Sequence, residues 1–170
     1  MIILGIDVPG GVIGGFAVYD SRHDRMRRWG NIHAGKSEQD DYRQLAKILR
    51  RRGYDVIAIE HPFLYRIAQF IGGVKMWATL HDVDWYMITT SSAQKVVFGH
   101  ALRERRQTPT GREVSGNKEY VLDWAREQYG DKDSPIDQHV ADAMLYAVGV
   151  AGRVSEKTMS IKKRLTSKAR

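Results

Sequence analysis

The chain has 170 residues, of which 42% are hydrophobic and 28% are charged, so it is long enough to form one domain with a hydrophobic core. It contains no cysteine, which excludes disulfides, thiolate metal sites and cysteine nucleophiles. No apolar run reaches the length of a membrane span, and no basic and apolar leader precedes the first predicted strand. We therefore expect a protein that is neither secreted nor inserted in a membrane.

The net charge of +7 is concentrated at the C-terminal end of the chain. Residues 153–170 hold seven Lys and Arg residues against one Glu, which leaves about +1 for residues 1–152. We therefore divide the chain into a domain over 1–152 and a basic tail over 153–170. Such a tail indicates a polyanionic partner, nucleic acid first, although a solubilising tail without a partner is the alternative.

The predicted elements begin with three strands, at 2–7, 12–20 and 25–34, which short turns join into an antiparallel meander. Two further strands, at 54–59 and 84–88, are separated by helical patterns. Helices are predicted between Ser37 and Gly53, from Pro62 to about Leu80, from Ser91 or Ser92 to about Leu102, from Lys118 to Tyr129 and from Ile136 to Ala151.

The order of these elements predicts an α/β domain with a five-stranded mixed sheet flanked by helices. Residues 103–117 are polar and contain Gly and Pro, so they are predicted to form a loop. Gly72 and Gly73 interrupt the second predicted helix and indicate either a bend or a point of close packing.

Two of the predicted strands end in a carboxylate, Asp7 in the first and Glu60 in the fourth. An unpaired buried carboxylate is too costly for these to be core residues, and adjacent parallel strands would direct both into one cleft. His139 and Asp142 lie three positions apart in the last helix and can reach that cleft from one helix face. Oxygen ligands suit Mg²⁺, and two such ions can support an in-line displacement at phosphorus, so we predict a divalent-metal site.

Each of the four residues also has an ordinary structural interpretation. Asp7 is compatible with a turn or a helix cap, and Glu60 with the cap of the following helix. His139 is compatible with a surface histidine, and Asp142 with one half of an i,i+4 pair. The occurrence of all four, in this order and on these elements, favours the metal site.

The segments Gly5-Ile6-Asp7-Val8-Pro9-Gly10, Ile59-Glu60 and His139-x-x-Asp142-Ala143 resemble the RuvC-type Holliday junction resolvases of the RNase H-like superfamily. The resemblance covers about residues 2–150. It implies an RNase H-like fold, a homodimer, two Mg²⁺ or Mn²⁺ ions, and paired symmetric nicks in a four-way DNA junction. The compact chain is compatible with a bacterial or phage-encoded enzyme, hence with the cytoplasm of a bacterial cell or phage-infected host.

The resemblance also assigns roles to individual residues. Asp7, Glu60 and Asp142 match three acidic metal ligands, and His139 takes the fourth position. An imidazole there can ligate a metal or assist proton transfer, and it favours Mn²⁺ somewhat. Asp137, two residues earlier on another helix face, ranks lower as a ligand.

Further residues match the DNA-contacting positions of these resolvases. Phe63 matches an aromatic residue that stacks on bases at the junction centre, and Lys95 and Lys118 match basic residues that hold the scissile phosphate. Four arginines of the polar loop are also predicted to contact the phosphate backbone of DNA: Arg103, Arg105, Arg106 and Arg112. The alternatives are a core position for Phe63 and solvated helix surfaces for the lysines.

The sequence departs from the resolvase pattern at two points. Val8 stands between Asp7 and Pro9, which predicts a reshaped turn beside the first ligand. Gly72 and Gly73 fall in the segment that forms the dimerisation helix of these enzymes, so the dimer could be built differently.

Three other functions are compatible with parts of the sequence. A less selective nuclease on branched DNA, flaps or RNA–DNA hybrids would use the same four ligands. A sugar-kinase or actin-like ATPase would need a second Gly-rich Asp loop, which is not evident. A catalytically silent DNA-binding module would not need intact ligand positions. No partner helicase can be inferred.

Overall fold

The computed structural model describes residues 1–9, 13–33, 35–50, 53–60, 65–102, 105–107, 113–115, 117–130 and 135–168. The description covers the backbone alone at 13, 38, 65–67, 105–107, 113–115, 117 and 156–168.

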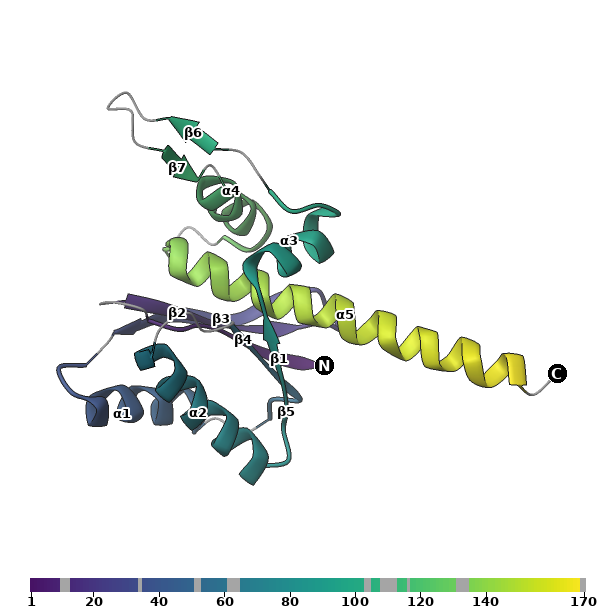
Figure 1. Ribbon diagram of the computed structural model, residues 1–170, viewed down its shortest axis with the longest axis horizontal. Helices are drawn as coiled ribbons and strands as arrows, with labels where there is room; N and C mark the ends of the chain where they lie inside the picture. The colour runs from purple at the N-terminus through teal and green to yellow at the C-terminus, as the bar shows by residue number, and fades with distance from the viewer. Residues whose placement is uncertain are drawn as a thin grey trace.

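The centre of the fold is a five-stranded mixed sheet in the order β3-β2-β1-β4-β5 (Figure 1). Its strands are β1 (Ile2–Asp7), β2 (Ile13–Asp20), β3 (Arg25–His33), β4 (Val56–Glu60) and β5 (Asp84–Ile88). β1, β2 and β3 form the predicted antiparallel meander, whereas β4 pairs parallel with β1 and β5 parallel with β4. The predicted α/β class and five-stranded mixed sheet are confirmed.

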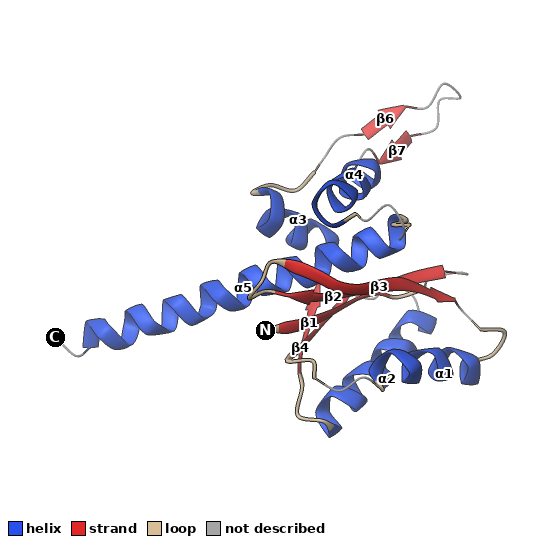
Figure 2. Cartoon of the chain, turned by 180° about the vertical axis from the view of Figure 1, so that it is seen from behind, coloured by secondary structure: helices blue, strands red, loops and turns tan. Residues whose placement is uncertain are grey.

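Helices cover both faces of this sheet (Figure 2). On one face lie α1 (Glu38–Leu49) and α2 (Tyr65–Leu80). On the other, α5 (Gln138–Lys168) lies directly on the sheet, and α3 (Thr90–Phe98) and α4 (Asn117–Tyr129) pack on α5. No helix among the described residues combines the length and apolar character that a membrane crossing requires.

The two-residue period of the strands separates the core into two layers. On β1, Ile3 packs with α5, whereas Leu4, Ile6 and Val8 pack on the α1 and α2 side. Asp7 therefore shares the α5 face of the sheet with Ile3. The extra residue Val8 is only 3% exposed and fills the opposite core layer.

Several boundaries differ from the sequence prediction. The third helix is capped by Thr89, whose side chain accepts from the backbone N–H of Ser92, and it ends at Gly99 in the left-handed conformation. Neither Ser91 nor Ser92 is the cap, and the helix does not reach Leu102. Gly72 and Gly73 lie inside the continuous helix α2, where Gly73 packs against the ring of Tyr42, so close packing is the correct interpretation.

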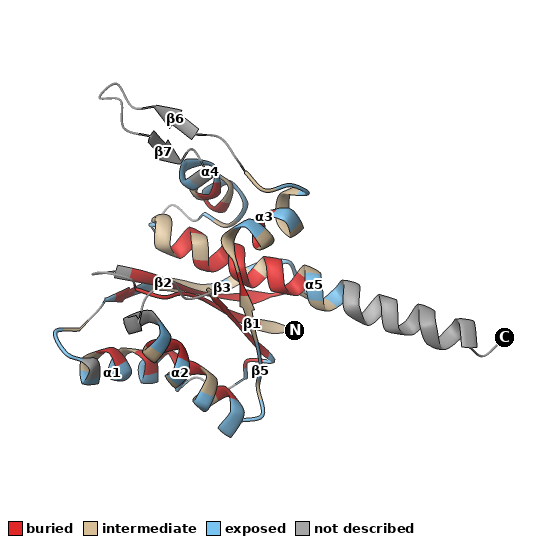
Figure 3. Ribbon diagram, in the orientation of Figure 1, coloured by how far each residue is buried: buried red, intermediate tan, exposed pale blue. Residues whose placement is uncertain are grey.

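Two further differences concern the polar loop and the C-terminal end. The predicted loop over 103–117 contains a short antiparallel hairpin, β6 (Arg105–Gln107) and β7 (Glu113–Ser115). The last helix does not end at Ala151 but continues to Lys168, beyond the edge of the sheet (Figure 1). The part of the basic tail from 153 to 168 is therefore helical. The buried residues of α5 lie in its part over the sheet (Figure 3).

Candidate active site

Asp7 and Glu60 lie at the same edge of the sheet because β1 and β4 run parallel. Their preceding residues, Ile6 and Ile59, are paired across the two strands. Ala58 packs in the α5 layer, so Glu60, two residues later, lies on that face as Asp7 does. The two strand-end carboxylates thus meet at one place, as predicted.

Two glycines let α5 approach the sheet closely at this place. A Cβ atom on Gly15, the partner of Asp7 on β2, would lie 2.1 Å from the carbonyl oxygen of His139. A Cβ on Gly5 would lie 2.0 Å from the carbonyl oxygen of Ala143. Only glycine leaves room for the helix backbone here, and the first turns of α5 therefore lie beside Asp7.

His139 and Asp7 are in direct contact. The Nδ1 atom of His139 lies 2.7 Å from Oδ2 of Asp7. The Asp7 side chain is 10% exposed and that of His139 is 42% exposed, so the pair lies where the buried sheet edge opens to solvent. The hydrogen bond to Asp7 raises the pKa of His139, which favours the imidazolium form.

Glu60 and Asp142 complete the cluster, and both have perturbed acidities. Burial, followed by the charge of Asp7, raises the pKa of Glu60 to about 8. Burial and the same charge raise the pKa of Asp142 to about 6, although a hydrogen bond from Gln138 and the charge of Lys118 oppose this shift. The structure thus brings all four predicted ligands together as a group with excess negative charge.

The neighbouring acid Asp137 has a different environment. Its Oδ1 accepts a hydrogen bond from the backbone N–H of Val140 at 3.0 Å, the pattern of a helix N-cap. Its Oδ2 accepts from the side-chain amide of Asn31 at 2.7 Å. Asp137 therefore starts α5 and fixes it to β3.

The remaining predicted site residues are distributed unevenly. Lys118 is the second residue of α4 and is exposed, and its charge acts on Asp142. Lys95 is exposed on α3, and no described contact joins it to the cluster. Arg105 and Arg106 lie on β6 with only their backbone described, and Phe63, Arg103 and Arg112 fall outside the described residues.

Three contributors were missed from the sequence. Gln138 donates from Nε2 to Oδ1 of Asp142 at 3.1 Å, so Asp142 has an i,i+4 partner in addition to its place in the cluster. Tyr146 is buried next to Glu60, and its hydroxyl lies 3.0 Å from Oγ1 of Thr90. A tyrosine within an apolar helical segment looks like an ordinary core residue, so no sequence signal distinguishes it.

The donor set of three carboxylates and one imidazole fits hard divalent cations. Burial and the charge of Asp7 raise the pKa values of Glu60 and Asp142, and a bound cation would favour their ionised forms. In the part of the chain that the structure describes, however, no group of three or more of these side chains is arranged to hold an ion as it stands. Asp7 and His139 instead form a hydrogen bond with each other.

The five-stranded mixed sheet with α5 laid across one face has the RNase H-like fold that is also seen in RuvC. The chain is similar to RuvC from Thermus thermophilus, with 20% identity over 93% of this chain and 98% of that one and a TM-score of 0.66. The same protein in complex with a Holliday junction substrate gives 19% identity over 93% and 97%, and a TM-score of 0.67.

The fowlpox virus Holliday junction resolvase also has this fold, with 16% identity over 92% of this chain and 99% of that one and a TM-score of 0.57. No protein-family model matches the sequence, and no curated protein matches it significantly. The predicted fold and its resemblance to the RuvC-type structures are confirmed.

Proposed function

We propose that this chain is a metal-dependent endonuclease that resolves four-way DNA junctions by paired symmetric nicks, acting as a homodimer. The observation that carries the proposal is the meeting of Asp7, Glu60, His139 and Asp142 at one sheet edge, with raised pKa values at Glu60 and Asp142. Two structures of the same fold, those of the T. thermophilus and fowlpox virus proteins, were solved with Holliday junction DNA, which supports the same substrate here.

The four clustered residues would hold two divalent ions, Mg²⁺ or Mn²⁺, which activate water and neutralise charge at the scissile phosphate. In its neutral form, with Nδ1–H donated to Asp7, His139 would have Nε2 available either to ligate a metal or to take a proton from the attacking water. Lys118, whose charge already reaches Asp142, can hold the phosphate. The products would be 5′-phosphate and 3′-hydroxyl ends.

DNA binding is assigned to further basic and aromatic residues of the chain. Lys95 lies on α3, Arg105 and Arg106 lie on β6, and Phe63, Arg103 and Arg112 belong to the same proposal from their sequence positions. Phosphate contacts from these cations would position the junction without reading its sequence.

The homodimer is supported by an exposed apolar surface on α2. Met76 is 65% exposed and Leu80 is 74% exposed, one helical turn apart. These exposed side chains are available to a second copy of the chain. Paired nicks require two active sites, which a homodimer would provide.

Substitution of Asp7 by Asn tests the assignment of the cluster. The variant should lose at least about 100-fold in the cleavage rate of a four-way junction, since even groups that only orient metal ligands contribute about 10- to 100-fold. It should bind the junction nearly as well as the wild type. Asp137→Asn is the matched control, because asparagine caps a helix as well as aspartate does and activity should persist. Full activity in Asp7→Asn would refute the proposal.

A further inference from the structure

A cavity of about 410 Å³ lies where the turn between β2 and β3 meets α3, α4 and α5. Its volume is within the range of ~300–1,000 Å³ that is typical of small-molecule sites. On α5 the cavity is lined by residues between Val148 and Ser155, whereas His139 and Asp142 belong to the first two turns of that helix. The cavity is therefore separate from the acidic cluster.

The charge of the lining is negative, although the whole chain carries a net charge of +7. Asp24 is the charged side chain among the described lining residues, and no Lys, Arg or His is found among them. Asp24 lies in the turn after β2 with a φ of 47°, in the left-handed region that Asp and Asn tolerate better than most residues. A carboxylate in a lining without cations favours a positively charged ligand.

The hydrogen bonds of Asp24 leave one of its oxygens available. Its Oδ1 accepts from the hydroxyl of Tyr19 at 2.7 Å and from that of Tyr129 at 3.4 Å. Burial raises the pKa of Tyr129 to about 12, so this hydroxyl stays protonated and can donate. The two donors occupy both lone pairs of Oδ1. No hydrogen bond from the described residues reaches Oδ2, which can therefore accept from a ligand.

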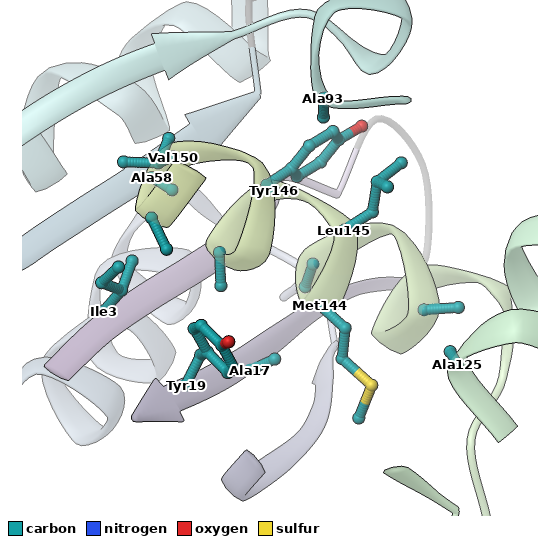
Figure 4. Packing of buried hydrophobic residues seen from close by; sticks show 14 of the residues in the cluster. Ile3, Ala17, Tyr19, Ala58, Ala93, Ala125, Met144, Leu145, Tyr146 and Val150 are labelled. Atoms are coloured by element: carbon teal, nitrogen blue, oxygen red, sulfur yellow. The ribbon is translucent and has the colours of Figure 1, made fainter. Parts of the chain in front are cut away.

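Aromatic rings form adjoining walls of the same cavity. Tyr19 and Tyr129 have ring centroids 6.3 Å apart at 72°, and Trp124 and Tyr129 have centroids 5.7 Å apart at 86°. Figure 4 shows Tyr19 among the buried residues between α5 and the sheet. Ring faces in several planes can attract a cation that lies within about 6 Å of a centroid. Val96 and Val148 add apolar surface suited to an alkyl chain.

We propose that this cavity binds a primary alkylammonium group, with its charge at Oδ2 of Asp24 and its alkyl chain along the apolar wall. A guanidinium binds a carboxylate best through both oxygens, and Oδ1 is already occupied. A divalent metal ion needs more oxygen ligands than this single carboxylate provides. A lysine side chain of another protein and a free aliphatic diamine both carry the required group. The inference does not depend on the proposed nuclease activity.

The test is a nuclear magnetic resonance titration of the full-length protein at constant ionic strength, followed at the backbone amides of Gln128 and Gly152, which line the cavity. The probes are 1,4-diaminobutane, Nα-acetyl-lysine methylamide and the neutral butane-1,4-diol. Both cations should give saturable shifts, and the tighter of the two indicates whether the source is a free diamine or a protein side chain. The diol should bind at least about tenfold more weakly than the diamine, since it forms no charge-assisted hydrogen bond.

Asp24→Asn should raise the dissociation constant of the better cation at least about tenfold, because a hydrogen bond between charged groups is lost. Asparagine keeps an oxygen for the tyrosine hydroxyls and tolerates the left-handed conformation, so the variant removes little besides the charge. Asp123→Asn is the matched control, because this exposed carboxylate next to Trp124 does not line the cavity. Its dissociation constant should equal that of the wild type.

Three results would overturn the inference. These are the absence of saturable shifts with either cation, equal affinities for the diamine and the diol, and equal weakening in Asp24→Asn and Asp123→Asn. The last result would indicate attraction by the overall charge rather than binding in the cavity. If Asp24→Asn does not fold, the comparison of diamine with diol in the wild type decides.

Discussion

The imidazole of His139 lies 2.7 Å from the carboxylate of Asp7, although 132 positions separate the two residues in the chain. The contact joins the end of the first strand to the first turn of the last helix. It depends on Gly15, because the backbone of His139 occupies the space that a larger residue at 15 would fill. The candidate site is therefore a consequence of how closely α5 lies on the sheet.

Gly15→Ala should accordingly disrupt both the fold and the site. Its Cβ would lie 2.1 Å from a backbone oxygen, which cannot rotate away as a side chain would. Overpacking of this kind costs about 1–3 kcal/mol, so the free energy of unfolding in urea should fall by that amount. Junction cleavage should fall with it, since His139 moves away from Asp7. Gly72→Ala is the control, because no atom lies within 4 Å of the added Cβ and the free energy of unfolding should not fall. Equal stability of the two variants would contradict the close approach of α5.

The pH dependence of stability should reveal the acidic cluster in the absence of metal. Glu60 and Asp142 have pKa values of about 8 and about 6, above their ordinary values of 4.5 and 3.8. The folded protein then binds more protons than the unfolded chain between about pH 4 and pH 8, so the free energy of unfolding decreases as pH rises through this window. Thermal unfolding in EDTA should show the decrease, and Mg²⁺ should reverse it most strongly near pH 8. Glu60→Gln should flatten the curve, and a wild-type curve as flat as that of the variant would contradict the assigned shifts.

The basic end of α5 should contribute salt-dependent affinity for DNA. Residues 156–170 carry six Lys and Arg residues and one Glu. Their deletion should weaken junction binding and reduce the slope of log K against log salt by about 0.9 for each phosphate that these residues neutralise. A chain with Lys162, Lys163 and Arg164 replaced by Gln keeps the helix length and should show a smaller change in the same direction. An unchanged slope in both variants would indicate a tail that only improves solubility.

The exposed apolar residues of α2 should hold the homodimer together. Leu80→Glu places a charge where Leu80 is now 74% exposed and available to a second copy. Burying an unpaired carboxylate in the interface would cost more than about 1.4 kcal/mol, so the dimer dissociation constant should rise at least about tenfold. Sedimentation equilibrium measures this directly. Tyr120→Glu alters an exposed aromatic residue on α4, at 52% exposure, and should leave the oligomeric state unchanged. A wild type that is monomeric, or a Leu80→Glu variant that dimerises normally, would count against the proposed interface.

The sheet could be predicted from the sequence because its strands have clear physical signatures. The run from Ile2 to Ile6 is apolar and ends at Asp7, and the same pattern recurs from Val56 to Glu60. The β6–β7 hairpin could not be predicted, because three-residue strands such as Arg105–Gln107 show neither alternation nor β-branched residues. The last helix was predicted too short, since Gly152 and the charged residues after it resemble a helix end.

The four clustered residues could be selected from the sequence as candidate ligands, whereas the residues that support their arrangement could not. Asp7 and Glu60 could be selected because each stands at the end of an apolar strand. His139 and Asp142 could be selected because their spacing puts them on one face of a helix. Gly15 and Tyr146, by contrast, act only through contacts with elements far away in the chain. A glycine in a strand and a tyrosine in an apolar helix are both common. Their roles depend on the packing of α5 against the sheet, which the sequence pattern does not reveal.

Cleavage of a synthetic four-way junction, beside duplex, flap and RNA–DNA hybrid substrates, tests the proposed function most directly. Wild type and Asp142→Asn would be compared in Mg²⁺, in Mn²⁺ and in EDTA. We predict paired symmetric nicks that are confined to the junction and are abolished in the variant and in EDTA. Cleavage spread over flaps and hybrids would contradict junction selectivity and indicate a general branched-DNA nuclease. The absence of cleavage with either metal would contradict the nuclease assignment itself.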